Sequence, residues 1–301
     1  MIFLISMKCI SVRSLIGYKL DELEKYAVKS SVFRKLILLV TRSDLYKTLI
    51  RHINKIRDYR LEEEVKKYPV PHHVAVIMDG NRRFARNLGL HPSAGHLLGR
   101  EKVKELLNWC FFELGIKILT IYAFSTENFR RNKEEVETLM RLFEKELKSA
   151  EKDSRIHKNK VRVNIIGRLD LLPENVRSLA EKIMDKTKHY NNYILNVAIA
   201  YGGREEIIQA IKRLAEDIKN DKIDLNQINE KAFSKYLYTE DLPDPDLIFR
   251  TSGEERISNF LLWQSAYSEL YFSDVFWPAL TKRDFLRAIR NFQRRKRRFG
   301  S

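Results

Sequence analysis

Short apolar runs that alternate with helical patterns constrain the fold of this chain more than any other feature. Such alternation predicts an α/β fold, with a central, mostly parallel sheet flanked by crossover helices. The expected strands are Val74–Met78, Ile118–Phe124, Val161–Ile166, Ile194–Ala200 and Leu247–Phe249. The helical patterns that separate and follow them cover residues 97–114, 133–152, 173–189, 204–219 and 230–237.

Polar clusters follow four of these strands. They are Asp79–Arg83, Ser125–Arg131, Tyr201–Arg204 and Arg250–Ser258. Because ligands of open parallel sheets bind beyond the carboxyl ends of the strands, we expect the four clusters to meet at one edge. This convergence of segments that are distant in sequence predicts an active site there.

The first cluster has the composition of a phosphate site. Gly80 lets the backbone come close to a ligand, the following helix offers free N–H groups, and Arg82 and Arg83 can pair with phosphate oxygens. Asp79 would repel a phosphate unless a hard cation lay between them, so its presence predicts Mg²⁺. The alternative is a capped strand-to-helix turn with solvated arginines.

The cluster after the last expected strand is basic as well. Arg250, Arg256 and Ser258 lie within nine residues and could hold a second diphosphate. A surface group of ion pairs with Glu254 and Glu255 is the alternative explanation for these arginines.

The motifs as a set resemble the cis-prenyltransferases, the family of the undecaprenyl and dehydrodolichyl diphosphate synthases. The resemblance runs from about residue 71 to residue 300 and leaves residues 1–70 outside. Its motifs are HVAVIMDGNRRFAR (73–86), GH (95–96), YAFSTENFRR (122–131), YGGRE (201–205) and DLIFRTSGEERISNFLLWQSAYSELYFSDVFWP (246–278).

The resemblance implies that isopentenyl diphosphate is condensed repeatedly onto an allylic primer, farnesyl or geranylgeranyl diphosphate. The product would be a long polycis-polyprenyl diphosphate, the precursor of a glycosyl carrier lipid. The implied catalytic residues are Asp79, Asn81, Ser125 and Asn128. The implied substrate-binding residues are Gly80, Arg82, Arg83, His96, Arg131, Arg250, Arg256, Ser258, Arg298 and Gly300. Asp79 and Glu269 would hold Mg²⁺, and the proton-abstracting base stays open among His96, Asn81 acting through water, Ser125 and the released diphosphate.

A growing prenyl chain needs an apolar tunnel. Two helical stripes could line one, although packing of the core explains such stripes equally well. The residues of the two stripes are Leu106, Leu107, Phe111 and Phe112, and Leu139, Met140, Leu142, Phe143 and Leu147.

The net charge of +16 is concentrated at the two ends of the chain. Residues 1–70 hold 15 basic and 8 acidic side chains, and residues 281–301 hold nine and one, so the segment between them is nearly neutral. A nucleic-acid-binding protein would spread basic residues over its binding face, which makes that class the less favoured alternative. We expect a basic, helical extension over 1–70 and a catalytic domain over 71–301 that ends in a basic tail.

Other features bear on location and assembly. Two cysteines give no disulfide framework, and no apolar run approaches the roughly 20 residues that span a bilayer, so we expect a cytoplasmic protein. The basic extension suggests peripheral contact with a membrane surface. Its apolar segment 31–40 could be an interfacial membrane helix, a dimer contact or a helix packed on the catalytic domain. Arg298-Phe299-Gly300 resembles the terminal motif that reaches a partner's substrate site in relatives, which implies a homodimer. A non-catalytic accessory subunit of a heteromeric enzyme is the alternative.

Overall fold

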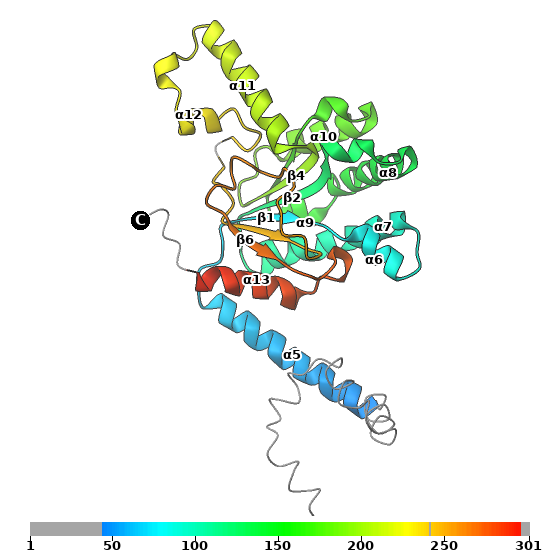
Figure 1. Ribbon diagram of the computed structural model, residues 1–301. Helices are drawn as coiled ribbons and strands as arrows, with labels where there is room; N and C mark the ends of the chain where they lie inside the picture. The colour runs from blue at the N-terminus through cyan, green and yellow to red at the C-terminus, as the bar shows by residue number, and fades with distance from the viewer. Residues whose placement is uncertain (1–43, 241, 296–301) are drawn as a thin grey trace, which may run out of the picture. The chain divides into compact units, whose positions relative to one another are not determined.

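The computed structural model describes residues 44–240 and 242–295 (Figure 1). By contacts the chain divides into two compact units, Met1–Arg60 and Leu61–Ser301. Helix α5 (Asp44–Lys66) passes through this boundary, so the division falls about ten residues before the expected limit at residue 70. The rest of the predicted extension, including the apolar segment 31–40, lies outside the described residues.

The second unit is built on a parallel sheet, as the sequence predicted. Within the described residues it has six strands in the order β3-β4-β2-β1-β5-β6, and every pairing is parallel. The strands are β1 (His73–Ile77), β2 (Ile118–Ser125), β3 (Val161–Ile166), β4 (Tyr193–Tyr201), β5 (Leu247–Arg250) and β6 (Glu269–Phe272). The first five match the expected runs, whereas the edge strand β6 was not predicted.

Helices cover the sheet on both sides, and α8 and α10 lie side by side over one end of it (Figure 1). The longer helices are α6 (Asn81–Asn87), α7 (Pro92–Leu107), α8 (Lys133–Ala150), α10 (Glu174–Thr187), α11 (Gly203–Lys219) and α13 (Lys282–Arg294). The shorter ones are η1 (Asn108–Glu113), η2 (Thr126–Arg130), α9 (Ser154–Lys158), η3 (Leu169–Leu171), η4 (Leu225–Gln227), α12 (Glu230–Ser234) and η5 (Trp277–Ala279).

Helix boundaries depart from expectation in three places. The helix expected over 97–114 begins earlier, at Pro92, where proline suits the first helical turn, and its last turn widens into the π-helix η1. The helix expected over 230–237 ends at Ser234. The segment interpreted as a basic tail forms α13, whose apolar side, Phe285, Leu286, Ala288 and Ile289, is buried in the core.

The two faces of the sheet contribute to different parts of the core. Val74 and Val76 of β1 face a cluster with Leu106 and Phe285, whereas Ala75 and Ile77 face a cluster with Phe260 and Leu261. A third cluster fills the space between β3, β4, α8 and α10. Burial of both faces explains why these strands are nearly continuous apolar runs.

A chain of polar side chains crosses four strands inside this apolar sheet. Thr120 donates its hydroxyl hydrogen to Nε2 of His73 (2.7 Å) and accepts a hydrogen bond from Asn196 (3.0 Å). Asn164 in turn donates to Oδ1 of Asn196 (2.9 Å), and His73 Nδ1 donates to the carbonyl oxygen of Pro243 (2.7 Å). Since each buried group has a partner only in this register, the chain helps to specify how the strands pair.

The last six residues of α5 pack with the second unit. Leu61 and Val65 are buried in its core, and Gln293 of α13 donates to the carbonyl oxygen of Val65 (2.8 Å). Lys282 lies 2.6 Å from Glu62, and Glu64 pairs with Arg290 and Arg294 of α13. Among the described residues, no helix combines the length and apolarity needed to span a membrane.

Candidate active site

Asp79 follows β1 at the carboxyl edge of the sheet and is held from several sides. Its carboxylate accepts a hydrogen bond from the backbone N–H of Gly80 (2.6 Å), and its own N–H donates to the hydroxyl of Thr251 (2.9 Å). Its carbonyl oxygen accepts from the N–H of Trp277 (3.0 Å). Gly80 has a φ of +100°, and a Cβ there would lie 2.7 Å from the Phe276 ring, so only glycine fits.

Arg250, at the end of the neighbouring strand β5, lies against Asp79. Its Nη2 donates to Asp79 Oδ2 (2.8 Å), and its Nη1 donates to the hydroxyl of Ser258 (2.7 Å) and to the carbonyl oxygen of Arg256. Burial raises the pKa of Asp79, but the hydrogen bond and charge of Arg250, the Gly80 N–H and the charge of Arg83 outweigh it. The net pKa lies below the ordinary value, so Asp79 is ionised at neutral pH.

Arg83 and Arg256 come from different motifs and share one acidic partner. Glu254 pairs with Nη1 of Arg83 at 2.8 Å and with Nη1 of Arg256 at 2.6 Å. Arg83 also donates to the hydroxyl of Ser252 and lies 3.4 Å from Asp79 Oδ2. The ion pairs considered as the alternative explanation therefore exist for Glu254, and they bring the two basic clusters together.

A second acidic residue, Glu135 in the first turn of α8, gathers the remaining basic groups. It lies 2.9 Å from Arg131, 3.3 Å from His96 and 3.6 Å from Arg82. Burial raises the pKa of Glu135, but the charges of Arg131 and Arg82 and the hydrogen bond from His96 lower it by more. The net pKa of Glu135 therefore lies below its ordinary value. Burial, aided by both arginine charges, lowers the pKa of His96 despite Glu135. Sequence reasoning missed Glu135, although its spacing of four from Arg131 is the signal of a helical ion pair.

Asn81 lies where α6 and α7 press together. A Cβ on Gly95 would lie 2.0 Å from the backbone oxygen of Asn81, and one on Gly99 would lie 2.2 Å from its Oδ1. Its Nδ2 donates to the carbonyl oxygen of Met78 (3.3 Å), whereas buried Oδ1 has no partner among the residues that the structure describes. The two glycines thus let Asn81 sit against α7 with a free acceptor atom.

Ser125 and Asn128, at the end of β2, are bonded to each other. The N–H of Ser125 donates to Oδ1 of Asn128 (3.1 Å), and the Ser125 side chain accepts from the Asn128 backbone, which caps η2. This reciprocal cap gives the pair a structural role, and it holds both at the edge where Asp79 lies.

Glu269 is not brought to Asp79 within one chain. It begins β6 and pairs with Leu247, while Asp79 bonds to Arg250 at the other end of β5. A strand rises about 3.3 Å per residue, so Glu269, level with Leu247, lies roughly 10 Å along the strand direction from the level of Arg250, which Asp79 contacts. The predicted metal pair of Asp79 and Glu269 is therefore wrong for a single chain, and Glu269 instead accepts a hydrogen bond from Arg295. Arg298 and Gly300 lie outside the described residues.

The donor set around Asp79 limits how a cation can bind. Within residues 44–240 and 242–295 there is no group of three or more His, Cys, Asp or Glu side chains that could hold a metal ion. Mg²⁺ commonly binds through one or two carboxylates together with substrate phosphates. Asp79 fits that mode, with the ligand's own oxygens completing the coordination.

An apolar cavity of about 230 Å³ begins beside the basic residues and runs between α7 and α8. Asn81, His96 and Gly99 line its polar end. Of the predicted tunnel residues, those that line it are Leu107, Phe111, Phe112, Leu139, Leu142, Phe143 and Leu147. Leu106 is buried in the core and Met140 lines a different groove, so for these two residues the packing alternative holds.

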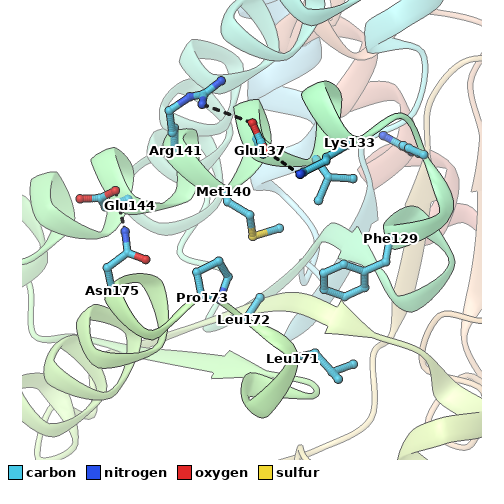
Figure 2. A pocket seen from close by; sticks show the side chains of 12 residues that line it. Phe129, Lys133, Glu137, Met140, Arg141, Glu144, Leu171, Leu172, Pro173 and Asn175 are labelled. Carbon is cyan, nitrogen blue, oxygen red and sulfur yellow. Dashed lines mark hydrogen bonds and ion pairs between the residues drawn. The ribbon is translucent and has the colours of Figure 1, made fainter.

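Met140 lines a separate, open groove of about 690 Å³ between α8 and α10 (Figure 2). Phe129, Leu172 and Pro173 form part of its apolar floor, and Glu137 lies between Lys133 and Arg141 at its rim (Figure 2). Helix α8 therefore separates the tunnel from this groove and lines both of them.

Comparison with known proteins gives a consistent result. The family model described as putative undecaprenyl diphosphate synthase matches residues 77–300. The tritrans,polycis-undecaprenyl-diphosphate synthase (geranylgeranyl-diphosphate specific) of Thermoplasma acidophilum is 56% identical over 247 residues, which cover 82% of this chain and 95% of the relative. The protein of the same description from Methanopyrus kandleri is 54% identical over 251 residues, covering 83% and 92%.

Solved structures agree with these matches. Lavandulyl diphosphate synthase from Lavandula x intermedia, in complex with dimethylallyl diphosphate, superposes with a TM-score of 0.73 at 34% identity, over 77% of this chain and 99% of that one. A probable undecaprenyl diphosphate synthase from Campylobacter jejuni gives a TM-score of 0.63 at 38% identity, over 77% and 100%.

Proposed function

The chain belongs to the undecaprenyl diphosphate synthase family of cis-prenyltransferases, and from that premise we propose that it extends geranylgeranyl diphosphate with isopentenyl diphosphate. The enzyme is a prenyltransferase that elongates a polycis-prenyl chain. The sequence left the primer open between farnesyl and geranylgeranyl diphosphate, and the specificity of the archaeal relatives favours the latter. The observation that carries the proposal is the gathering of basic side chains from several loops around Asp79, at the polar end of an apolar tunnel.

In this proposal the allylic diphosphate binds between α6 and the start of α8, with its prenyl chain in the tunnel. Gly80, Arg82, Arg83, His96 and Arg131 would hold its oxygens, and Asn81 would lie where the chain enters. Charge on this diphosphate grows as its bond to carbon breaks, so fixed positive groups there stabilise the transition state. Mg²⁺, bound by Asp79 and phosphate oxygens, would add to this neutralisation.

Isopentenyl diphosphate would bind beside it, held by Arg250, Arg256 and Ser258. Its diphosphate is a handle that stays attached, so basic side chains suffice there. The double bond of isopentenyl diphosphate attacks the allylic carbon, a carbon–carbon bond forms, and the allylic diphosphate leaves with the bonding electrons. Loss of a proton then sets the cis double bond. Alignment of the two reactants can supply several kcal/mol of the barrier reduction, on the order of 7–11 for ideal geometry.

The direct test is incorporation of labelled isopentenyl diphosphate. The full chain with Mg²⁺ and geranylgeranyl diphosphate should give long, butanol-extractable products, and farnesyl diphosphate should be the poorer primer. No incorporation with either primer by a folded protein would refute the proposed activity. Transfer of sugar phosphate to the dephosphorylated product by a membrane fraction would test its proposed use as a glycosyl carrier lipid.

We also propose that the enzyme works as a homodimer. Arg298 and Gly300 are expected to complete the isopentenyl diphosphate site of the partner. Among the described residues β6 is the edge strand of the sheet, and Leu270 is partly exposed there. Light scattering should then give twice the chain mass, and Arg298→Ala should raise the KM for isopentenyl diphosphate. A monomer with full activity would contradict the assembly and leave the reaction standing.

The product is insoluble in water, so we propose that the enzyme touches a membrane through the hairpin of α6 and α7. Leu88, Leu90, Leu97 and Leu98 are each about half exposed there, and residues 80–100 contain arginines but no Asp or Glu. Exposed apolar residues beside basic ones favour binding to anionic lipid. Replacing all four leucines with Ser should weaken co-sedimentation with anionic vesicles. Unchanged binding, lost only when residues 1–60 are deleted, would assign the contact to the extension instead.

A further inference from the structure

Asn259 is absent from the expected site residues, yet its contacts join three segments of the site. It follows Ser258, whose hydroxyl accepts from Arg250. Its Nδ2 donates to Oε1 of Glu127 in the loop after β2 (2.9 Å), and its Oδ1 accepts from the N–H of Arg204 at the start of α11 (2.9 Å). Its carbonyl oxygen accepts from the N–H of Gly203 (2.7 Å).

The local backbone explains why this residue is asparagine. Asn259 has a φ of +62°, in the left-handed region, where Asn is far better tolerated than most side chains with a Cβ. Ser258 before it has a φ of +48°, so the chain turns sharply where it leaves the basic loop. Asn is therefore the residue that combines this conformation with both a donor and an acceptor at the tip of a short side chain.

The glycines of the Tyr-Gly-Gly-Arg motif make room for these contacts. A Cβ on Gly202 would lie 2.8 Å from Nδ2 of Asn259 and equally close to the hydroxyl oxygen of Thr126. A Cβ on Gly203 would lie 2.7 Å from the side chain of Leu262. The motif thus lets the loop after β5 lie directly on the start of α11, and Asn259 is the contact between them.

Resting on the proposed function, we propose that Asn259 is a positioning residue for the isopentenyl diphosphate site. It fixes the loop that follows Arg250 and carries Ser258 against η2, which follows Ser125 and carries Asn128. In the proposed function, the loop with Ser258 binds isopentenyl diphosphate, and the segment after β2 binds the primer through Arg131. The Glu127–Asn259 hydrogen bond therefore sets how the two diphosphates lie relative to each other.

The position of Ser258 depends on the hydrogen bonds of the Asn259 side chain to Glu127 and to the N–H of Arg204, which together we call the clasp. Ser258 and Asn259 are adjacent left-handed residues, and Arg250 reaches the hydroxyl of Ser258 and the carbonyl oxygen of Arg256 in the same loop. Without Asn259, the loop loses its bonds to Glu127 and Arg204 and samples other conformations. Isopentenyl diphosphate then has to order the loop when it binds, so its binding is weakened more than the binding of the primer.

Two substitutions separate the clasp from backbone strain. Asn259→Gly keeps the left-handed backbone and removes both side-chain bonds, and it should raise the KM for isopentenyl diphosphate about tenfold, the effect of one hydrogen bond to a charged group. Asn259→Asp keeps the acceptor for Arg204 but sets a carboxylate against Glu127, and a similar rise is expected. The KM for the primer should change less than the KM for isopentenyl diphosphate. Asn220→Gly, at the exposed far end of α11, is the matched control and should leave both unchanged.

A rescue experiment tests the bond itself. In the double variant Asn259→Asp with Glu127→Gln, the glutamine amide can donate to the aspartate, so the hydrogen bond is restored with donor and acceptor exchanged. The KM for isopentenyl diphosphate should return to within about threefold of the parent value, with Glu127→Gln alone as reference. A merely structural role for Asn259 predicts lower melting temperatures, unchanged KM in the single variants and no rescue, and that result would overturn the proposal.

Calorimetry with inorganic diphosphate separates failure of this proposal from failure of the proposed function. If the parent chain condenses neither primer, the proposed function fails, and binding of inorganic diphosphate still tests the clasp. Weaker binding by Asn259→Gly than by Asn220→Gly would support it, and equal binding would refute it.

Discussion

The Nη2 atom of Arg250 lies 2.8 Å from Oδ2 of Asp79, so the arginine assigned to one diphosphate touches the carboxylate assigned to the other. The contact follows from the sheet, because Ile77 pairs with Arg250 where β1 and β5 end side by side. Arg83 approaches the same oxygen at 3.4 Å. The two proposed substrate sites, which are separate in sequence, therefore meet at one carboxylate oxygen.

Loss of the Asp79 charge should abolish most of the activity. Asp79→Asn keeps the size of the side chain and removes the carboxylate that we propose binds the cation. Turnover should fall by about 1,000-fold, as on loss of a preorganised charge-stabilising group. Label incorporation at saturating substrates measures this, with folding checked by circular dichroism. Asp185→Asn, which removes an exposed carboxylate paired with Lys188, is the control and should retain full turnover. Comparable turnover in the two variants would contradict the role of Asp79.

Arg250→Lys should fail even though it conserves charge. The guanidinium reaches Asp79, Ser258 and the Arg256 carbonyl oxygen at once, and a lysine ammonium cannot reproduce that planar fork. We expect the KM for isopentenyl diphosphate to rise by about 10- to 100-fold, with a smaller change for the primer. Initial rates with each substrate varied in turn check this. A larger effect on the primer would reverse the assignment of the two sites.

Gly99→Ala should impair both folding and catalysis. The new Cβ would lie 2.2 Å from Oδ1 of Asn81 and 2.8 Å from the Trp277 ring, so Asn81 or α7 has to move. Overpacking of this kind costs about 1–3 kcal/mol of unfolding free energy, and displacement of Asn81 should lower turnover more than tenfold.

Gly89→Ala gives the matched comparison. Gly89 has a φ of +70°, and a Cβ added there would have nothing within 4 Å, so alanine at this position is strained but contacts nothing. Stability should fall by about 1 kcal/mol while turnover stays at the parent value. Equal turnover in the Gly99 and Gly89 variants would show that the closeness of α7 to Asn81 does not matter for catalysis.

His73 should make stability depend on pH, with an effect that begins above the range where ordinary carboxylates titrate. Burial lowers its pKa to about 4, against the hydrogen bond to Pro243 and the charge of Asp246, which raise it. Between pH 6.5 and 4 the unfolded chain therefore binds a proton that the folded chain does not, so unfolding free energy falls as pH falls through this window. The full effect is about 3 kcal/mol, and it is complete only below pH 4.

Urea unfolding at pH 6.5 and pH 5 measures this contribution, because ordinary carboxylates change little between those values. His73→Gln should be less stable at pH 6.5, since the Thr120 hydroxyl hydrogen loses the His73 acceptor, but its stability should decline less between the two pH values. An equal decline in both proteins would mean that His73 titrates normally in the fold.

The sequence predicted the interior of the sheet because β1 to β5 are buried on both faces and consist of apolar runs. Strand β6 escaped notice because Glu269 and Leu270 lie at the partly exposed edge, where the pattern is mixed. Helix α13 escaped because its many Arg and Lys residues obscured four buried apolar positions. In both cases tertiary packing, rather than local composition, determines the element.

For the site, sequence reasoning located the residues at the carboxyl ends of strands, such as Asp79 and Arg250. It missed Glu135, Thr251 and Asn259, because their roles depend on which loops lie against each other. It also joined Glu269 to Asp79, a pairing that the register of β5 and β6 does not allow within one chain. Motif order along a chain carries no information about the level at which each residue lies in the sheet.

The packing of α5 against α13 decides where the N-terminal extension can be cut. A truncation after Lys67 would remove Leu61 and Val65 from the core and take Glu64 away from Arg290 and Arg294. The shortened protein would then carry a newly exposed apolar strip beside unbalanced positive charge, and it would adhere to lipid or nucleic acid because of that damaged surface. A cut after Arg60 leaves the surface of α13 covered, so only that shorter deletion reports on what the extension itself does.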